Sequence, residues 1–283
     1  MKALMTIVFL FLSISNLKAS LRVMTFNTTC DLCSKGKFDS FRKRKKWIID
    51  TTKRVRPDIF AYQEVSNIFQ LFYFKRKLKD YKFHISHWGP LHYPDPAIFY
   101  NKKRFKVLKT GGFWLGPKGE KRFNFGWKFG LPRRVEWIKF FDKIESKKFI
   151  FVSGHFDNRK KNKTKSSEMF LKHFSEESLP LVFAGDTNSK PDTVAYENLT
   201  SHFEDVYYMA ENIIINKNSN TSIDDSCNLE KGDTFPECHV DHILTSKKHS
   251  WEVLSWGVDQ FKYGKKNRFT SDHRAFFADL ELP

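Results

Sequence analysis

The stretch Thr270-Ser271-Asp272-His273-Arg274 stands directly before a mostly apolar run from Ala275 to Leu280. A short apolar run bounded by turn residues is typical of a buried β-strand, so we expect an Asp-His pair at the mouth of this strand. Ligands and catalytic groups of α/β proteins collect where strand ends open into loops. The stretch therefore predicts an active-site edge that is built from strand ends.

Five earlier apolar runs also carry a polar, chemically capable residue at one end. The strands expected near residues 23–26, 59–63, 149–152, 181–185 and 241–244 present, in chain order, Asn27, Glu64, His155 with Asp157, Asp186 with Asn188, and Asp241. Because carboxylate, amide and imidazole groups recur at these ends, we expect them to form one site.

The chemistry of this residue set points to a metal and a phosphoester. Carboxylate and amide oxygens without thiolates suit Mg²⁺ or Mn²⁺ rather than zinc, and Asn27, Glu64 and Asp272 are the candidate ligands. A metal beside a carboxylate and a histidine supplies what phosphodiester hydrolysis needs, namely an activated water, charge neutralisation and an acid for the leaving oxygen. The residues predict a metal-assisted phosphoester hydrolase.

Size and composition fit one large core. The chain has 283 residues, of which 40% are hydrophobic and 16% aromatic, with 30 Phe against 9 Tyr. Length alone permits one or two domains. No internal repeat or long Pro/Gly/Ser linker separates the polar strand ends, so we expect a single domain over residues 20–283.

The N-terminus is typical of a cleaved secretory signal. Lys2 precedes the apolar run Leu4–Ile14, and a small residue, Ala19, follows. This run is shorter than the roughly 20 residues that span a bilayer, and its flanks fit a signal peptide over residues 1–19. We expect a mature chain without a transmembrane segment in a secreted or periplasmic location; a buried N-terminal helix or a retained anchor is the alternative.

Four cysteines agree with an oxidising compartment. Cys30 and Cys33 form a C-x-x-C, while Cys227 and Cys238 lie shortly before Asp241. Disulfides within each pair are the simplest arrangement, although four cysteines allow three connectivities. A zinc site at the first pair is the alternative, but no second C-x-x-C or H-x-x-x-H accompanies it. A thioredoxin-like redox role would need a βαβ context that Cys30 lacks.

The chain is strongly basic, with 49 Lys+Arg against 32 Asp+Glu, and loss of Lys2 and Lys18 with the signal would lower its formal charge from +17 to +15. Such a charge attracts polyanions, although a Lys-rich solubilising surface gives the same composition. One basic cluster directly follows His155 and another directly precedes Asp272, so phosphate contacts near the site are expected. The candidates after His155 are Arg159, Lys160 and Lys161.

Two further basic stretches lie elsewhere in the chain. Residues 118–134 form a basic, Gly- and aromatic-rich segment that we expect to be a loop. Residues 42–56 alternate basic with apolar residues, which indicates an amphipathic helix with a charged outer face. We expect no functional role for this helix.

The motifs at the strand ends resemble, in order, those of the endonuclease/exonuclease/phosphatase superfamily, whose members include DNase I-like nucleases, deadenylases, sphingomyelinases and inositol-phosphate phosphatases. They are Thr25-Phe26-Asn27, Gln63-Glu64-Val65, Gly154-His155-Phe156-Asp157, Gly185-Asp186-Thr187-Asn188, Val240-Asp241-His242-Ile243-Leu244 and Ser271-Asp272-His273. Where the family often has Asp-Phe-Asn, this chain has Asp186-Thr187-Asn188, which keeps the functional residue types.

The resemblance implies an α/β fold, a four-layer sandwich of two mostly antiparallel β-sheets flanked by helices. It implies that Glu64 binds Mg²⁺ or Mn²⁺ with help from Asn27 and Asp272, with Ca²⁺ as an alternative structural ion. The remaining roles that it implies are a water-activating Asp186, a water-positioning Asn188, a His273 that acts on the phosphate and is paired with Asp241, a His155 at the phosphate or leaving group, and an Arg133 on a non-bridging oxygen.

Two details of the resemblance concern partners within the chain. The motifs do not identify an acidic partner for His155, and Asp95 is the candidate. Cys238, three residues before Asp241, resembles the position of a disulfide in secreted DNase I-like enzymes.

The interpretation that unites these features is a secreted, low-specificity, metal-dependent endonuclease, monomeric, acting on DNA or alternatively RNA. A sphingomyelinase-like lipid phosphodiesterase is the first alternative, because the aromatic segment Phe123–Phe129 could insert into a membrane. A catalytically inactive polyanion-binding protein is the second.

Overall fold

The computed structural model describes residues 20–31, 39–86, 93–118, 125–128, 130–214, 239–265 and 267–283. The predicted signal peptide lies outside these residues, as do Cys33, Cys227 and Cys238, so the cysteine pairings stay predictions. Cys30 is buried and disulfide-bonded. Among the helices within these ranges, none has the length and apolar character needed to cross a membrane.

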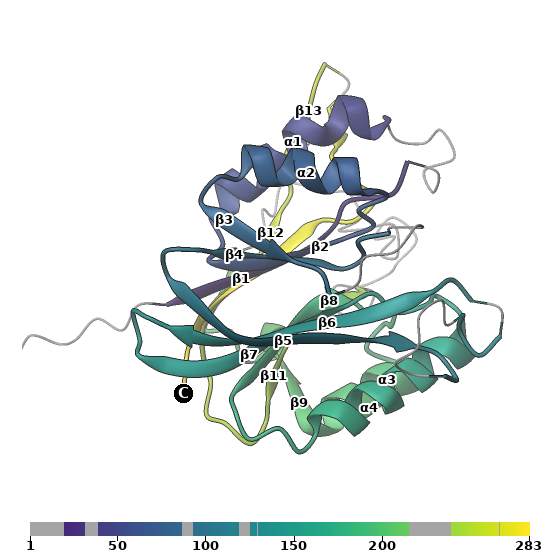
Figure 1. The fold of residues 1–283 in the computed structure, drawn as a ribbon, viewed down its shortest axis with the longest axis vertical. Helices are drawn as coiled ribbons and strands as arrows, with labels where there is room; N and C mark the ends of the chain where they lie inside the picture. Colours follow the sequence, from purple (N-terminus) through teal and green to yellow (C-terminus); the bar gives the residue numbers. More distant parts are fainter. Residues whose placement is uncertain are drawn as a thin grey trace, which may run out of the picture.

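Two β-sheets face each other, and helices cover the outer face of each (Figure 1). The first sheet has the order β10-β12-β15-β1-β2-β4-β3, with bounds Asn212–Ile214, Glu252–Asp259, Ala275–Glu281, Leu21–Asn27, Ile59–Gln63, Ala97–Asn101 and Tyr81–His84. The second has the order β5-β6-β7-β8-β11-β9, with bounds Phe105–Leu115, Arg133–Asp142, Lys147–Gly154, Leu181–Asp186, Asp241–Ser246 and Phe203–Asp205.

Helices α1 (Phe41–Val55) and α2 (Ile68–Lys77) cover the first sheet, while α3 (Lys160–Phe174) and α4 (Val194–His202) cover the second. The short helix α5 (Val206–Met209) follows β9, and β13 (Lys262–Tyr263) pairs with β14 (Arg268–Phe269). Parallel pairing within the described residues is confined to β1–β2, β7–β8 and β10–β12. The predicted four-layer sandwich of mostly antiparallel sheets is confirmed.

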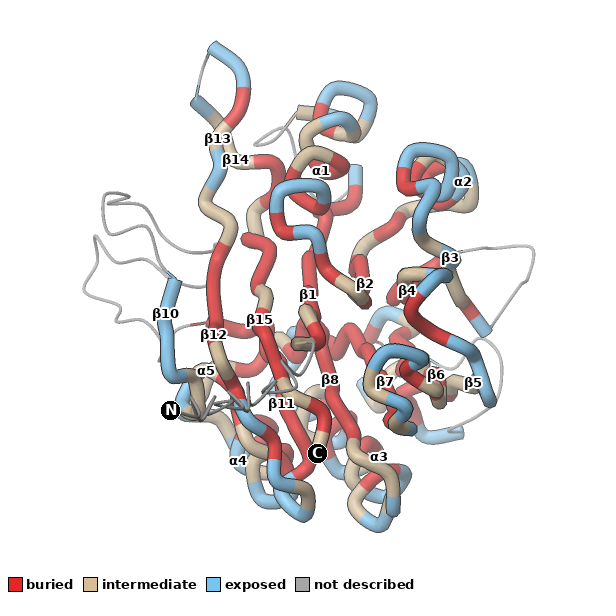
Figure 2. The backbone as a smooth tube through the Cα atoms, turned by 90° about the vertical axis from the view of Figure 1, so that its left-hand side faces the viewer, coloured by how far each residue is buried: buried red, intermediate tan, exposed pale blue. Residues whose placement is uncertain are grey.

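Successive side chains of each strand point to opposite faces of its sheet, and this alternation explains why these layers form. In β1, Val23 packs between the sheets and Met24 packs toward α1 and α2; in β7, Phe151 packs between the sheets and Val152 toward α3. Because successive side chains point to opposite faces, a strand covered on both sides is apolar throughout. Figure 2 shows β1, β8, β11 and β15 buried along most of their length, with exposed residues on the outer helices.

Pairing register brings the polar strand ends together. The ends of β1 and β2 align in parallel, with Asn27 opposite Gln63, and the start of β11 aligns with the end of β8, with Asp241 opposite Asp186. His155 forms a parallel bridge with Asp186. The polar ends of the two sheets therefore face each other.

Candidate active site

Asp186, the last residue of β8, lies at the centre of the site. Its Oδ2 accepts a hydrogen bond from Asn27 Nδ2 (2.9 Å), which crosses from one sheet to the other, and its Oδ1 accepts one from the backbone N–H of Asn188 (2.8 Å). Burial raises the pKa of Asp186, but the charges of His155 and His273 and these hydrogen bonds together lower it below its ordinary value. Asp186 is therefore an ionised carboxylate, the state that a proton acceptor needs.

His273 and Asp241 form a hydrogen-bonded pair beside Asp186. Nδ1 of His273 lies 2.6 Å from Asp241 Oδ2, and its Nε2 lies 3.9 Å from Asp186 Oδ2. Burial lowers the pKa of His273, but the carboxylates of Asp241 and Asp186 outweigh burial and hold this pKa well above its ordinary value. The ring is therefore an imidazolium at neutral pH, which can donate from Nε2 to a phosphate oxygen.

A second Asp-His pair also approaches Asp186. Nδ1 of His155 lies 2.7 Å from Asp95 Oδ2, and its Nε2 lies 3.4 Å from Asp186 Oδ2. Burial and the charge of Arg133 lower the pKa of His155, but Asp95 and Asp186 raise it above its ordinary value. Asp95 is thus the acidic partner of His155, and two histidines converge on one carboxylate.

Arg133, at the start of β6, is buried against this second pair. Its Nη1 lies 3.1 Å from Asp95 Oδ2 and 2.7 Å from His155 Nδ1. The predicted contact between Arg133 and a substrate phosphate stays a prediction, and in the structure the guanidinium binds Asp95. Arg133 and Arg134 are buried strand residues, so the expectation that they belong to a basic loop is wrong.

The predicted metal ligands gather around the turn that follows β1. Glu64 Oε2 accepts a hydrogen bond from Cys30 N–H (2.6 Å), and Asp272 Oδ1 accepts one from the Thr29 hydroxyl. The Thr29 N–H donates to Asn27 Oδ1 (3.1 Å). The carboxylate and amide oxygens of this group are the donors that a hard divalent cation prefers, so the residues present fit such an ion.

Helix α1 contributes a residue that the sequence pattern missed. Arg44 is fully buried, with Nη1 donating to the carbonyls of Thr28 and Thr270 (both 2.7 Å) and Nη2 to that of Thr29 (2.8 Å). It therefore ties the turn after β1 to the segment before Asp272. The expectation that helix 42–56 has no role is wrong at this residue, because backbone carbonyls of two loops supply the acceptors that a buried guanidinium requires.

Left-handed backbone occurs at three residues of the site, Thr29 (φ 58°), Glu64 (φ 60°) and Asn188 (φ 50°). This conformation is uncommon outside glycine and costs about 1–3 kcal/mol, so it persists where surrounding contacts hold it. Each of the three donates its backbone N–H to a side-chain oxygen of the site, on Asn27, Asp95 and Asp186 respectively. Hydrogen bonds within the site therefore help to hold these three residues in their left-handed conformation.

The basic residues after His155 lie at the N-terminal end of α3. A surface pocket of about 580 Å³, named here the basic pocket, is lined by Lys128, Arg159, Lys160, Lys161, Thr164, Lys165 and Val194. Arg159, Lys160 and Lys161 are exposed. This pocket brings together positive charge from the first two turns of α3 and from Lys128.

Two contacts join the N-terminal end of α3, which lines the basic pocket, to the predicted site residues and their loops. Asp157, which the sequence placed next to His155, accepts a hydrogen bond from the Arg159 backbone N–H (2.9 Å). Lys163 Nζ lies 2.5 Å from the carbonyl oxygen of Asn188, in the loop that follows Asp186. The helix end and the catalytic loop are thus held together.

The known proteins that resemble this chain were found among solved structures. No family model matches the chain, and no curated protein sequence matches it. An endonuclease/exonuclease/phosphatase family protein from Bacteroides thetaiotaomicron is 25% identical, with a TM-score of 0.78 over 94% of this chain and 99% of that chain. A mannosyl-6-phosphatase from Bacteroides thetaiotaomicron VPI-5482 is also 25% identical, with a TM-score of 0.77 over 92% of this chain and 99% of that chain.

A third structure has the same fold at lower identity. TDP2 of D. rerio, complexed with a single-strand DNA product, is 16% identical, with a TM-score of 0.68 over 93% of this chain and 99% of that chain. The shared sandwich defines the class of protein as a phosphoesterase fold, and in this chain Asp-His pairs lie at the strand ends. The chain therefore has the fold of endonuclease/exonuclease/phosphatase family proteins.

Proposed function

We propose that the chain is an exported, metal-dependent phosphodiesterase that cleaves DNA internally, with RNA as a lesser substrate. The observation that carries the proposal is the basic pocket, together with the contact of Lys163, on the same helix, with the loop that follows Asp186. A polynucleotide has phosphates on both sides of the scissile bond, so positive charge beside the centre binds it independently of sequence. A small phosphate ester would not need this extended surface.

The catalytic residues divide into an acceptor and two donors. The ionised Asp186 accepts a proton from the attacking water, and Asn188 positions that water. The imidazolium of His273, held by Asp241 at 2.6 Å, donates to a non-bridging oxygen as negative charge develops there. His155, held by Asp95, donates to the phosphate or the leaving oxygen.

Mg²⁺ is the proposed cofactor, with Mn²⁺ as a substitute. Glu64, Asn27 and Asp272 would hold it, and when bound it supplies charge neutralisation at the phosphate. The oxygen donor set of the turn after β1 supports this choice.

A phosphomonoesterase acting on a phosphorylated sugar is a second candidate. It is supported by the similarity to a mannosyl-6-phosphatase, which exceeds the similarity to the DNA-bound TDP2 structure. A lipid substrate has one supporting observation, since Phe125 in the aromatic segment is 59% exposed.

The first experiment compares these substrates directly. Purified mature protein is incubated with supercoiled plasmid, single-stranded RNA, mannose 6-phosphate and sphingomyelin liposomes, each with Mg²⁺ and with EDTA. Chelator-sensitive conversion of plasmid to nicked and linear forms is expected, at the highest rate of the four. Faster release of phosphate from mannose 6-phosphate, with plasmid intact, contradicts the nuclease proposal.

A salt titration then tests the basic pocket. Replacing Arg159, Lys160 and Lys161 by Gln is expected to flatten the slope of log K against log salt by about two to three units on duplex DNA, because each phosphate contact contributes about −0.9. Hydrolysis of a small diester stays near the parent rate. The control replaces the exposed residues Lys75, Arg76 and Lys77 at the end of α2, which covers the other sheet from α3, and is expected to leave the slope unchanged.

Export is tested on the protein itself. The signal-like residues and the cysteines support a mature chain that starts near Ser20 with two disulfides. Intact mass before and after reduction with alkylation is expected to show no alkylation without reductant. A mass that retains residues 1–19, or thiols that alkylate without reductant, contradicts export with oxidised cysteines.

A further inference from the structure

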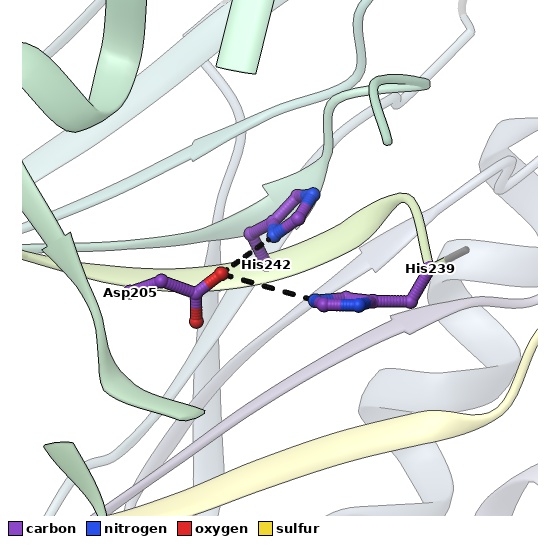
Figure 3. Close-up of side chains that lie close together, drawn as sticks. All are labelled: Asp205, His239 and His242. Carbon is purple, nitrogen blue, oxygen red and sulfur yellow. Dashed lines mark hydrogen bonds and ion pairs between the residues drawn. The ribbon is translucent and has the colours of Figure 1, made fainter. Parts of the chain in front are cut away.

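A second Asp-His cluster lies on the other face of β11 from Asp241. It consists of Asp205 at the end of β9, His239 just before β11 and His242 within β11 (Figure 3). All three are buried, with exposed fractions of 4%, 1% and 1%. Polar groups at this depth require an explanation, because burial without compensation is costly.

The three side chains point their donor atoms at one place. His242 Nδ1 lies 2.9 Å from Asp205 Oδ2, and His239 Nε2 lies 3.8 Å from the same oxygen. All three donor atoms lie within 4.8 Å of one another. Two ligands of a tetrahedral zinc ion are about 3.3 Å apart when each bond is about 2.0–2.1 Å, which falls between the two separations seen here.

The second nitrogen of His242 fixes its tautomer. Nε2 lies 2.8 Å from the carbonyl oxygen of Ser189, and since a carbonyl can only accept, Nε2 carries the hydrogen. In a neutral ring the lone pair of Nδ1 then faces a carboxylate oxygen. Either a proton or a metal ion must therefore lie between these two atoms.

The carboxylate of Asp205 is held by groups outside the cluster. The Tyr196 hydroxyl donates to Oδ2 (3.1 Å) and the Tyr207 N–H donates to Oδ1 (3.1 Å). Metal sites in proteins commonly show this arrangement, in which a ligating histidine donates its other nitrogen to a carbonyl and the ligating carboxylate is itself hydrogen-bonded.

We infer that Asp205, His239 and His242 form a buried zinc site with three protein ligands and one open position, separate from the proposed catalytic centre. The ion would join β9, the start of β11 and the loop at Ser189. His239 and His242 flank Asp241, and Ser189 follows Asn188, so the site would brace two catalytic segments from behind. Because the site is buried, the ion would be acquired during folding.

The experiment refolds the mature chain with and without zinc. His273→Ala serves as the background, because Asp186, Asp241 and His273 also bring three donor atoms within 4.8 Å. Protein unfolded in denaturant with EDTA is refolded in ZnCl₂, desalted and measured by metal mass spectrometry. The background is expected to keep about one more zinc per chain than the same protein carrying His239→Leu. His202→Leu, an exposed histidine, is the matched control and is expected to keep the ion.

Stability and cobalt spectra give independent readouts. Zinc is expected to raise the Tm of the background by about 5–10 °C at about a hundredfold excess over its Kd, and to leave the His239→Leu protein unmoved. If His239→Leu does not refold, Co²⁺ in the background protein decides, with a visible tetrahedral spectrum lacking a thiolate charge-transfer band expected. Equal zinc in both proteins, no Tm change in the background, or no such cobalt spectrum overturns the proposal and leaves a proton between His242 and Asp205.

Discussion

The two Asp-His clusters on either side of β11 use the same residue types in opposite ways. Asp241 and His242 are neighbours in sequence, and because successive strand residues face opposite sides, one belongs to each cluster. In the catalytic cluster the His273 side chain is 15% exposed, whereas the Asp205 and His242 side chains are 1% and 0% exposed. The two clusters therefore share residue types and differ in whether a substrate could reach them.

The clusters also differ in how many nitrogens of the histidine ring lie within hydrogen-bond distance of an acceptor. His273 has one nitrogen on a carboxylate and turns the other toward Asp186 at 3.9 Å, too far for a hydrogen bond. His242 uses both nitrogens within hydrogen-bond distance, on Asp205 and Ser189. A ring with one nitrogen still directed at a reacting centre can move a proton, and a ring held at both ends can only hold its neighbours.

The largest effect is expected at the catalytic cluster. Asp186→Ala, Glu64→Ala and His273→Ala should each lower turnover by at least about two orders of magnitude, since each removes a general acid–base or metal contribution. The fold should persist, as judged by circular dichroism, because these residues lie at strand ends. Near-parent hydrolysis by any two of the three would refute the site.

A substitution in the buried cluster of Asp205, His239 and His242 should lower stability more than it lowers turnover. Asp205→Asn leaves His242 and His239 facing a neutral amide, and removing one partner of a buried charged pair costs about 3–5 kcal/mol. Urea unfolding should show this loss, while kcat of the folded fraction changes far less than in Asp186→Ala. If Asp205→Asn keeps its stability but loses turnover, Asp205 acts in catalysis and the two clusters do not differ in role.

Arg44 gives a further test, because it is buried like Asp205 but contacts the turn that we propose binds the metal. Arg44→Met is expected to raise the Mg²⁺ concentration for half-maximal activity by about 10–100-fold, the range for outer-shell contacts. Arg42→Met, an exposed neighbour on α1, is the control. Equal Mg²⁺ dependence in the two proteins, with Arg44→Met merely less stable, would reduce Arg44 to a packing role.

The smallest effect is a shift in pH dependence. The Asp241 carboxylate raises the pKa of His273 against burial, so Asp241→Asn lowers this pKa. The imidazolium exists below the folded-state pKa and is lost as pH rises through it, so the alkaline limb of kcat/KM should move to lower pH. Asp50→Asn on α1 should leave it in place. An alkaline limb that stays put in Asp241→Asn means that His273 does not titrate in this profile.

The sequence predicted the parts of the site that lie next to strands. A buried strand appears in the sequence as an apolar run. Asn27, Glu64 and Asp186 could therefore be located from the apolar run that precedes each of them. Pairs made by tertiary structure could not be located in this way. Asp95, which meets His155 across 60 residues, was named only as a candidate because no local pattern encodes that distance.

Arg44 and Asp205 were missed for a different physical reason. The helical pattern assigns arginine to the solvent side, but Arg44 finds its acceptors in backbone carbonyls, which every residue carries and no sequence displays. Asp205 is the last residue of a strand of three residues, too short to produce a periodic signal. Burial of charge depends on partners, and the partners are set by the fold.

The place of β1 has a consequence for how the protein is made. This strand lies between β2 and β15, and Leu21 pairs with Leu280. A chain that emerges from its amino end holds β1 without its antiparallel neighbour until nearly the whole polypeptide has followed. The first sheet therefore cannot close until β15 has been synthesised.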